Sequence, residues 1–239
     1  MATRACVFLL TLVFTCRLTP EWPQYWVIWN VGQGQWVTLA HEGKCWHFDS
    51  GGESAPWKSL ISECREKPNL FTFSHWDWDH ISFVSSARYR LPDNCLLKRP
   101  MGESSPRKAK IFSAFRPCEV NAPFASWTNP EAANSNAGSR VVLWKETLLP
   151  GDSTIHEEKT WSNRFSGLDK VRILVLGHHG SRTSTSRELL SKATGLKMAI
   201  ASARERRYGH PHARVVKNLR DFHIPLLKTE DWGNIYIWF

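Results

Sequence analysis

The feature that most constrains this chain is the segment at residues 74–80, Ser-His-Trp-Asp-Trp-Asp-His, which follows an apolar run at residues 69–73. Four of its side chains can ligate a metal ion: His75, Asp77, Asp79 and His80. Alternate residues of an extended segment share a side, so the first three can point together while a tight turn adds the fourth. Trp76 and Trp78 would point the other way, into packing. A polar helix N-terminus capped by Asp79 is the structural alternative, but so dense a cluster beside an apolar strand favours a metal-binding loop.

Three further sites share this character, because each lies where an apolar run ends. They are Asp152 after residues 148–151, His178 and His179 after residues 173–176, and His210 and His212 after residues 198–202. In α/β folds, ligands gather outside the carboxyl ends of the strands. We therefore expect these side chains to join the loop at residues 74–80 in one site. The histidines without such a setting are expected to be structural: His41, His47, His156 and His223.

The order of apolar patterns predicts a layered α/β fold, since strands come first and then alternate with helices. Apolar, aromatic and β-branched runs predict strands at residues 25–31, 36–40, 44–49, 69–74, 140–144, 147–149, 171–176, 197–201 and 233–238. Helices are expected at residues 57–65, 81–89, 186–192 and 213–222. With 239 residues and a hydrophobic fraction of 42%, the chain can form one sizeable core. Residues 20–239 are expected to form a single domain.

Positive charge is concentrated in the least regular part of the chain, residues 91–137. Its basic cluster comprises Lys98, Arg99, Arg107, Lys108 and Lys110. Such a cluster is usually a solvated loop, and a phosphate-facing loop is the functional alternative. The formal net charge of +9 also favours polyanionic partners such as nucleic acid. The 13 Trp residues are expected mainly in the core, although some could line a groove and stack on bases or sugars.

Residues 1–19 have the pattern of a secretory signal peptide, with Arg4 before an apolar run at residues 5–14. That run is too short to span a bilayer as a stable helix. We therefore expect an exported protein, periplasmic or extracellular, which lipidation at Cys16 would anchor to a membrane; a buried first strand is the alternative. No later stretch is long and apolar enough for a transmembrane helix, so no integral membrane domain is expected.

Four cysteines lie beyond this N-terminal segment: Cys45, Cys64, Cys95 and Cys118. In an exported protein they permit two disulfides, with three possible connectivities. Because no two cysteines are spaced as C-x-x-C, a structural zinc ribbon is not expected.

The motifs of this chain resemble those of the metallo-β-lactamase superfamily, and specifically its ComEC-like branch, the nuclease-type domain of bacterial DNA-uptake proteins. The resemblance runs from about Trp26 to the C-terminus. Its pieces, in chain order, are residues 30–34, 49–51 and 75–80, Asn136 with Ser139, residues 150–152, 177–181 and 208–211, and Thr229 before Gly233. It implies an αββα four-layer sandwich, here as a stand-alone domain, with a metal site at one edge of two facing sheets.

The resemblance also implies two divalent metal ions. By position, the ligands of the first ion would be His75 and Asp77, and those of the second Asp79, His80 and His178, with Asp152 as the bridge. The choice between His178 and its neighbour His179 depends on a backbone turn that the sequence does not define. The position of Asp77 holds histidine in most of the superfamily, and no histidine precedes Asp152 to complete the ligands of the first ion. Such an oxygen-rich site makes Mn²⁺ or Mg²⁺ a rival to Zn²⁺.

The remaining site residues would act on the substrate or support the ligands. By the same resemblance, His179 and His210 would sit over the site and bind phosphate or protonate a leaving group, with Asp79 also at the reacting centre. Asp49 would orient the histidine loop from behind, and Ser181 would give similar support.

These features predict a metal-dependent phosphodiester hydrolase, most simply a nuclease acting on DNA. Two ions would activate a water for in-line attack on phosphorus, and basic residues at 98–110 would offset the growing negative charge. A phosphodiesterase acting on small or cell-wall phosphoesters of the phosphocholine type shares the same site and is the enzymatic alternative. A non-catalytic nucleic-acid binder that retains the fold is the alternative from another class.

Overall fold

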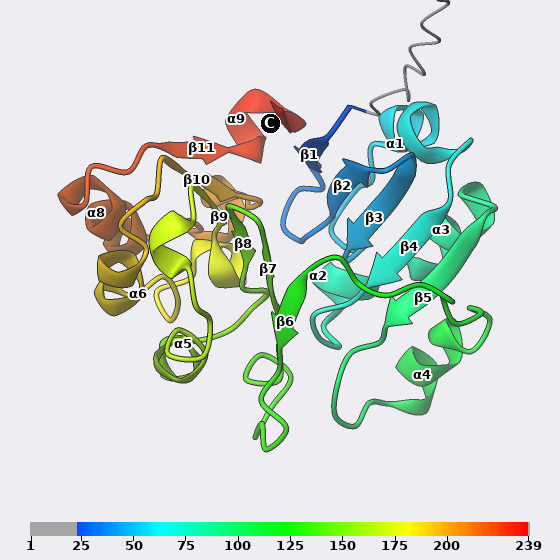
Figure 1. Cartoon of the computed structure of the whole chain (residues 1–239), viewed down its shortest axis with the longest axis horizontal. Helices are drawn as coiled ribbons and strands as arrows, with labels where there is room; N and C mark the ends of the chain where they lie inside the picture. The colour runs from blue at the N-terminus through cyan, green and yellow to red at the C-terminus, as the bar shows by residue number, and fades with distance from the viewer. Residues whose placement is uncertain (1–22, 239) are drawn as a thin grey trace, which may run out of the picture.

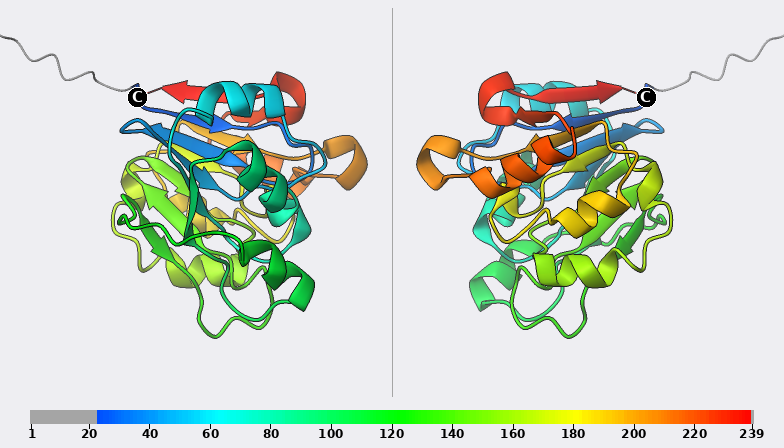
Figure 2. Two further views of the ribbon diagram at one scale, coloured as in Figure 1. Left: turned by 90° about the vertical axis from the view of Figure 1, so that its right-hand side faces the viewer. Right: turned by 90° about the vertical axis from the view of Figure 1, so that its left-hand side faces the viewer.

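The computed structural model describes residues 23–238 as two facing sheets with helices on their outer faces (Figures 1 and 2). The first half of the chain forms the right-hand side of Figure 1 and the second half forms the left, apart from the last strand, which returns to the first sheet. The layers form the predicted αββα sandwich. The predicted signal segment at residues 1–19 lies outside the described residues. Within residues 23–238, no helix is long and apolar enough to cross a membrane.

The first sheet has the strand order β12-β1-β2-β3-β4-β5. Its strands are β1 (Tyr25–Ile28), β2 (Val37–His41), β3 (Lys44–Phe48), β4 (Asn69–Thr72), β5 (Asn94–Lys98) and β12 (Ile235–Trp238). Neighbours among β12, β1, β2 and β3 are antiparallel, whereas β3, β4 and β5 run parallel. The carboxyl ends of β3 and β4 therefore lie at the same edge.

The second sheet has the strand order β11-β10-β9-β8-β7-β6. Its strands are β6 (Ala125–Trp127), β7 (Val141–Trp144), β8 (Thr147–Leu149), β9 (Ile173–Val175), β10 (Met198–Ala201) and β11 (Leu226–Lys228). Neighbours from β8 to β11 are parallel, so the loops that follow them emerge at one edge. Side chains from those loops contact side chains that follow β4, which places the carboxyl ends of both sheets together.

Helices on the outer faces complete the four layers. The first sheet is covered by α1 (Trp57–Cys64), α3 (Val84–Arg90) and α4 (Pro106–Phe112), and the second by α5 (Ile155–Trp161), α6 (Arg187–Lys192) and α8 (Ala213–Asp221). Short helical turns lie in the loops: α2 (Trp78–Ile81), η1 (Leu168–Lys170), η2 (Gly177–Gly180), α7 (Glu205–Tyr208) and α9 (Thr229–Trp232).

The apolar side chains form a core between the sheets and one under each helical layer. Trp26 and Ile28 of β1 face the second sheet, whereas Val27, between them, packs under the first helical layer. Because alternate residues of a strand point to opposite faces, both faces of β1 are buried and its sequence is almost continuously apolar. Trp residues supply much of this packing, as expected, and Trp26, Trp29, Trp36 and Trp161 are among the largest fully buried side chains.

Two disulfides tie elements to the first sheet. Cys45 of β3 bonds Cys64 at the end of α1, and Cys95 of β5 bonds Cys118 in the segment before β6. Four cysteines allow three connectivities, and the structure contains this one.

The segment at residues 91–137 is more regular than predicted, since it contains β5, α4 and β6. The strand β5 lies at the edge of its sheet with half-exposed side chains, so it lacks the apolar run that marks a buried strand. The helix α4 begins with a recognisable signal: Ser105 caps it through a hydrogen bond from the Lys108 amide, and Pro106 is its first residue. These elements were not predicted because lysine, serine and proline are frequent in this segment and are typical of loops.

Candidate metal centre

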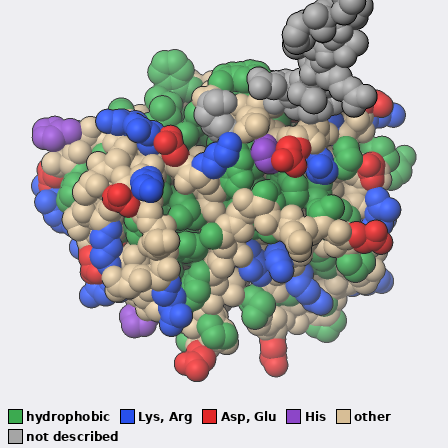
Figure 3. Space-filling model, in the orientation of Figure 1, with side chains coloured by type: hydrophobic (Ala, Val, Ile, Leu, Met, Phe, Trp, Pro, Cys, Tyr) green, Lys and Arg blue, Asp and Glu red, His purple; other side chains and the backbone are tan. Residues whose placement is uncertain are grey.

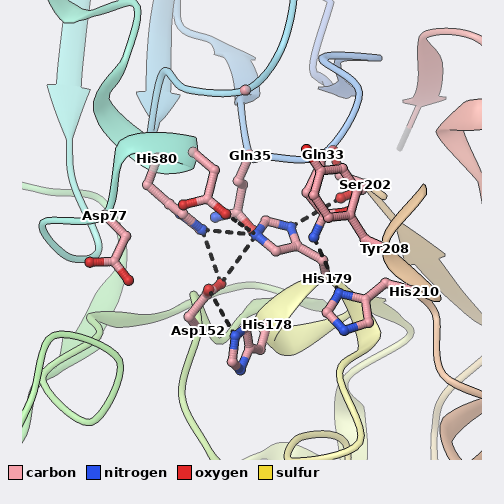
Figure 4. A network of polar contacts seen from close by, with 12 residues as sticks. Gln33, Gln35, Asp77, His80, Asp152, His178, His179, Ser202, Tyr208 and His210 are labelled. Carbon is pink, nitrogen blue, oxygen red and sulfur yellow. Dashed lines mark hydrogen bonds and ion pairs between the residues drawn. The ribbon is translucent and has the colours of Figure 1, made fainter. Parts of the chain in front are cut away.

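The loops after β4, β8, β9 and β10 bring polar side chains from distant parts of the chain to one edge of the sandwich. They supply the histidine-rich segment at residues 75–80, then Asp152, then the pair His178 and His179, and finally His210. Figure 4 shows His80 and His179 turned toward Asp152 on one side, with His178 on another side of the same carboxylate. The predicted convergence of these segments is therefore present in the structure.

One ligand group gathers around the Oδ1 atom of Asp152. It comprises Asp79, His80, Asp152 and His179, whose ligand atoms all lie within 4.8 Å of one another. The Nε2 atom of His80 is 3.0 Å from Asp152 Oδ1, and His179 Nε2 is 3.2 Å from Asp79 Oδ2. The two imidazole Nε2 atoms face each other at 3.2 Å. Two carboxylates and two imidazoles with their ligand atoms this close together can coordinate one divalent cation.

A second group gathers around the other oxygen of the same carboxylate. The Nε2 atoms of His75 and His178 are each 3.7 Å from Asp152 Oδ2, and Asp77 Oδ2 is 3.6 Å from His75 Nε2. Asp152 thus presents one oxygen to each group, which is the geometry a carboxylate needs to bridge two ions. Both groups combine nitrogen and oxygen donors, a set compatible with Zn²⁺ or Mn²⁺.

Buried atoms without hydrogen-bond partners support metal binding at these positions. The Nε2 atom of His75 and the Oδ1 atom of Asp152 are buried and make no hydrogen bond of acceptable geometry, although charged neighbours lie close to both. Buried polar atoms are normally satisfied. A cation bound between these groups would satisfy both atoms, so the residues present fit the ions expected from the sequence.

The electrostatics of the cluster also attract positive charge. Burial alone would lower the pKa of His80, but the carboxylates of Asp152 and Asp49 raise it well above its usual range. Burial would raise the pKa of Asp152, yet His80, His179 and His75 hold it well below its usual range. The carboxylate of Asp152 is therefore ionised and ready to bind a cation at neutral pH.

Asp49 orients His80 from behind. Its side chain accepts hydrogen bonds from the amide of Gln35 at 2.8 Å and from the backbone and hydroxyl of Ser74 at 2.7 Å each. The Nδ1 atom of His80 donates to Asp49 Oδ2 at 2.7 Å, which leaves Nε2 to face the cluster. Such partners hold a ligand's ring orientation and tautomer. The expected supporting role of Asp49 has this geometry, whereas Gln35 was not anticipated.

His178 and His179 point in different directions because both have left-handed backbone conformations. Their φ angles are 48° and 54° within η2, and Gly180 follows with φ 80°. His179 Nδ1 donates to the Ser202 carbonyl at 3.0 Å, so its Nε2 faces Asp79. The sequence led us to place His178 with Asp79 and His80, and His179 above the site. The geometry instead puts His179 in that group and His178 beside Asp152 Oδ2, so a histidine does stand ready to complete the first ion's ligands.

His210 lies at the rim of the cluster rather than inside it. Its Nδ1 atom is 3.2 Å from the Gln33 amide nitrogen, and its ring centroid is 6.2 Å from that of His178. Burial lowers the pKa of His210, and His179 and His178 add to this effect. Gln33, which the sequence analysis missed, also accepts a hydrogen bond from the Arg204 backbone. It therefore links the glycine turn after β1 to the loop that carries His210.

Two other predicted residues lie farther from the ligand atoms. The Ser181 hydroxyl is 3.1 Å from that of Thr183, which in turn is 3.3 Å from His178 Nδ1. The Ser181 side chain therefore reaches His178 only through Thr183, but the Ser181 backbone N–H donates directly to the His178 carbonyl at 2.8 Å and holds the turn that carries the histidine. His212 caps α8 by accepting a hydrogen bond from the Arg214 amide, which is a structural task.

The two Trp residues of the loop differ, contrary to the expectation that both point into packing. Trp76 is 4% exposed, and its Nε1 atom donates to the Met101 carbonyl at 2.9 Å. Trp78 is 41% exposed. It begins α2, so the chain has already left the extended conformation in which alternate residues share a side.

His47 belongs to the core, as expected. It is fully buried, accepts a hydrogen bond from Trp36 Nε1, and lies 2.9 Å from Asn69 Oδ1 through its Nε2 atom. Burial lowers its pKa to about 4. Cys45 and Cys64 lie beside it, but their disulfide removes the thiolates that a metal would require.

Known proteins of similar sequence include competence and recombination proteins, and no family model matches the chain. The chain is 34% identical over 111 residues to ComE operon protein 3 of Bacillus subtilis, covering 44% of this chain and 14% of that protein. It is 25% identical to Competence protein ComA of Neisseria gonorrhoeae, covering 85% and 30%, and 28% identical to Recombination protein 2 of Haemophilus influenzae, covering 87% and 28%. The chain thus spans less than a third of the length of these relatives.

Solved structures that resemble the chain identify its fold. The metallo-β-lactamase fold protein YhfI from Bacillus subtilis matches with a TM-score of 0.55 and 11% identity, covering 90% of this chain and 98% of that one. A diphosphatase from the PhnP family matches with a TM-score of 0.56 and 10% identity over the same shares. The chain therefore has the metallo-β-lactamase fold, as predicted, and its sequence relatives are of the expected competence-protein type.

Proposed function

We propose that this protein is a metal-dependent phosphodiester hydrolase and that DNA is its substrate. The observation that carries the proposal is Asp152, whose two oxygens face two separate sets of imidazole and carboxylate ligands. The two ligand sets that meet at Asp152 would hold a pair of ions, and two-ion sites are typical of enzymes that displace groups at phosphorus. The choice of DNA is supported by the resemblance to competence proteins and by the formal net charge of +9.

Two bound divalent ions would activate a water for attack and offset charge on the phosphate oxygens. The residues of the chain would orient the ligands and transfer a proton. Asp49 and the Ser202 carbonyl fix the rings of His80 and His179. Because both nitrogens of His179 face partners, it is no longer the best proton donor for the leaving oxygen.

His210 is the better candidate for that proton transfer. It is held at the rim by Gln33, close to the cluster but outside the two ligand groups. A histidine whose pKa is lowered by burial is a stronger acid when protonated, which favours donation to a departing oxygen.

Cationic side chains beside His210 can hold the phosphate backbone. Arg204 and Arg207 of the loop before His210 pair with Glu53 at 2.8 and 2.6 Å, yet both remain about half exposed or more, at 47% and 67%. Glu53 balances one of the two charges, so the pair keeps a net positive charge toward the solvent. This arrangement favours an anionic substrate.

We further propose that the protein is exported. Disulfides persist mainly in oxidising compartments, and the Cys45–Cys64 and Cys95–Cys118 bonds match the export expected from the N-terminal sequence. In protein recovered from its native cells, we expect an alkylating reagent to modify none of these four cysteines unless the disulfides are first reduced.

The function is tested by offering substrates to purified protein loaded with Mn²⁺ or Zn²⁺. Single-stranded DNA, duplex DNA, RNA and a small chromogenic phosphodiester should be compared under equal conditions, with Asp221→Asn as a control at a surface aspartate of α8. We expect cleavage of DNA that requires added metal and is unaffected in the control. Cleavage of the small ester alone would contradict the choice of DNA as substrate. If none of the four substrates were cleaved, the proposed phosphodiester hydrolase activity would be wrong.

A further inference from the structure

Trp78 is an exposed aromatic side chain inside the metal-binding loop itself. It lies between Asp77 and Asp79 in the chain, one from each ligand group, and it is 41% exposed. Exposing so much indole surface to water is unfavourable by the hydrophobic effect. A large ring at this place, next to two ligands in the chain, can contact a substrate held at the metal centre.

Two cations of α4 flank the Trp78 ring. The Arg107 guanidinium carbon is 5.2 Å from the ring centroid, and the Lys108 Nζ atom is 5.6 Å from it. Neither cation forms an ion pair with a carboxylate among residues 23–238. Both cations lie over the ring in cation–π contact, and their charges are thus available to an anion that binds next to it.

The neighbouring Trp76 anchors these cations to the metal-binding loop. Its Nε1 atom donates to the carbonyls of Met101 and Gly102, in the segment that leads from β5 to α4. Its ring packs edge-on against Phe112 at the end of α4, with centroids 5.3 Å apart. The position of α4 relative to the ligands is therefore set by a buried contact rather than by the exposed side chains. In Figure 3, Lys and Arg side chains are visible below and to the right of the centre of the face shown, on the side where this segment lies, and others are spread over the left-hand half.

We propose that Trp78, Arg107 and Lys108 form a platform that binds an unpaired nucleobase and the phosphate next to it, beside the metal centre. The proposal rests on the proposed function and adds a preference for single-stranded nucleic acid. An aromatic face accepts any base, because every base has a π-face, and adjacent cations hold the backbone. A base within a duplex is already stacked on its neighbours, so the platform would select strands or ends that are unpaired.

The first experiment measures binding rather than cleavage. A fluorescent phosphorothioate oligothymidylate, which resists cleavage, is titrated with metal-loaded protein and followed by anisotropy. The comparison ligand is the same strand with abasic tetrahydrofuran residues in place of thymidines. We expect the strand with bases to bind about ten-fold more tightly. In Trp78→Ala this difference should disappear, whereas Trp78→Phe should retain most of it.

The matched control is Trp238→Ala. Trp238 is 60% exposed and pairs with Tyr25, the first residue of β1. Gln33, which contacts His210, follows the other end of β1. Trp238 therefore lies at the end of the first sheet that is away from the metal centre. Its replacement should leave both affinities unchanged, and equal metal content in Trp78→Ala and wild type would show that the loop is intact.

The second experiment tests the cations through the salt dependence of binding. For a single strand, removing one cation that binds a phosphate should reduce the slope of log affinity against log salt by about 0.7. In the double variant Arg107→Gln/Lys108→Gln we expect this reduction once for each of the two cations. The control Lys58→Gln/Arg65→Gln removes two charges from the region of α1, and we expect it to leave the slope unchanged.

Equal binding of base-containing and abasic strands by wild type, or unchanged binding in Trp78→Ala, would overturn the platform. Either result leaves the proposed function standing if DNA is still cleaved. Conversely, a strand bound through Trp78 but never cleaved would support the platform and contradict the nuclease.

Discussion

At the scale of single residues, Asp49 shows how a side chain outside the ligand groups can control them. It is buried and receives four hydrogen bonds, from Gln35, from Ser74 twice and from His80. Its backbone φ of 60° lies in the left-handed region, which Asp and Asn tolerate better than most residues. Asn is therefore the substitution that changes the charge with the least strain.

We predict that Asp49→Asn weakens metal binding about 10- to 100-fold, because His80 loses the partner that holds its ring. Competition with a chelator measures the affinity, and circular dichroism checks that the fold persists. Asp169→Asn, in the turn η1, is the matched control. An affinity equal to that of wild type would show that Asp49 does not orient the ligand.

His47 predicts a dependence of stability on pH that is separate from the metal site. Its pKa is about 4 in the folded protein against an ordinary value of 6.5, because burial penalises the charged ring. Between these two values the unfolded chain binds a proton that the folded chain does not. The free energy of unfolding is therefore highest, as far as His47 is concerned, above about pH 6.5. It decreases by about 3 kcal/mol in total as the pH falls from there to about 4.

Urea unfolding of metal-free wild type and His47→Gln across this pH range tests the assignment. The free energy of unfolding should fall less steeply with decreasing pH in the variant. Parallel curves for the two proteins would mean that His47 does not titrate in this way.

At the scale of elements, the positions of the ligands were predictable and the directions of some side chains were not. Asp152 and the histidine pair follow short apolar strands, so their place at one edge could be read from the sequence. The exchange between His178 and His179 could not, because it depends on two left-handed residues and on Gly180, where an added Cβ would lie 2.6 Å from Pro211. Contacts between distant loops decide that turn.

The exposed Trp78 was missed for a related reason. Alternation along an extended segment predicts that it points with Trp76, but the helical turn α2 begins at Trp78 and breaks the alternation. Likewise, β5 and α4 were hidden because an edge strand and a short exposed helix carry few apolar residues.

The disulfides make a prediction at the same scale. Cys45–Cys64 and Cys95–Cys118 close loops with sequence separations of 19 and 23 residues. Loss of one such crosslink should lower the free energy of unfolding by about 2–5 kcal/mol. Cys95→Ser/Cys118→Ser is the informative variant, because its bond fixes the edge strand β5 and not the metal ligands. Chemical unfolding measures the loss, and stability equal to wild type would contradict a structural role.

At the scale of the whole molecule, the sandwich serves to place two half-sites against each other. The first sheet contributes the ligands after β4, and the second contributes those after β8 and β9. Neither set surrounds a cation alone, since each ligand group draws on both sheets. The site therefore depends on the correct packing of the sheets, and Asp152 is the residue at which the two groups meet.

The most direct test of the two-metal centre is a titration of metal-free protein with Mn²⁺ in which DNA cleavage is measured after each addition, for wild type and Asp152→Asn. We predict that wild-type activity rises until two ions are bound per chain, and that Asp152→Asn binds fewer ions and loses at least about a hundred-fold in rate. Activity that needs no metal, or that is the same in Asp152→Asn as in wild type, would contradict a two-metal centre built on Asp152.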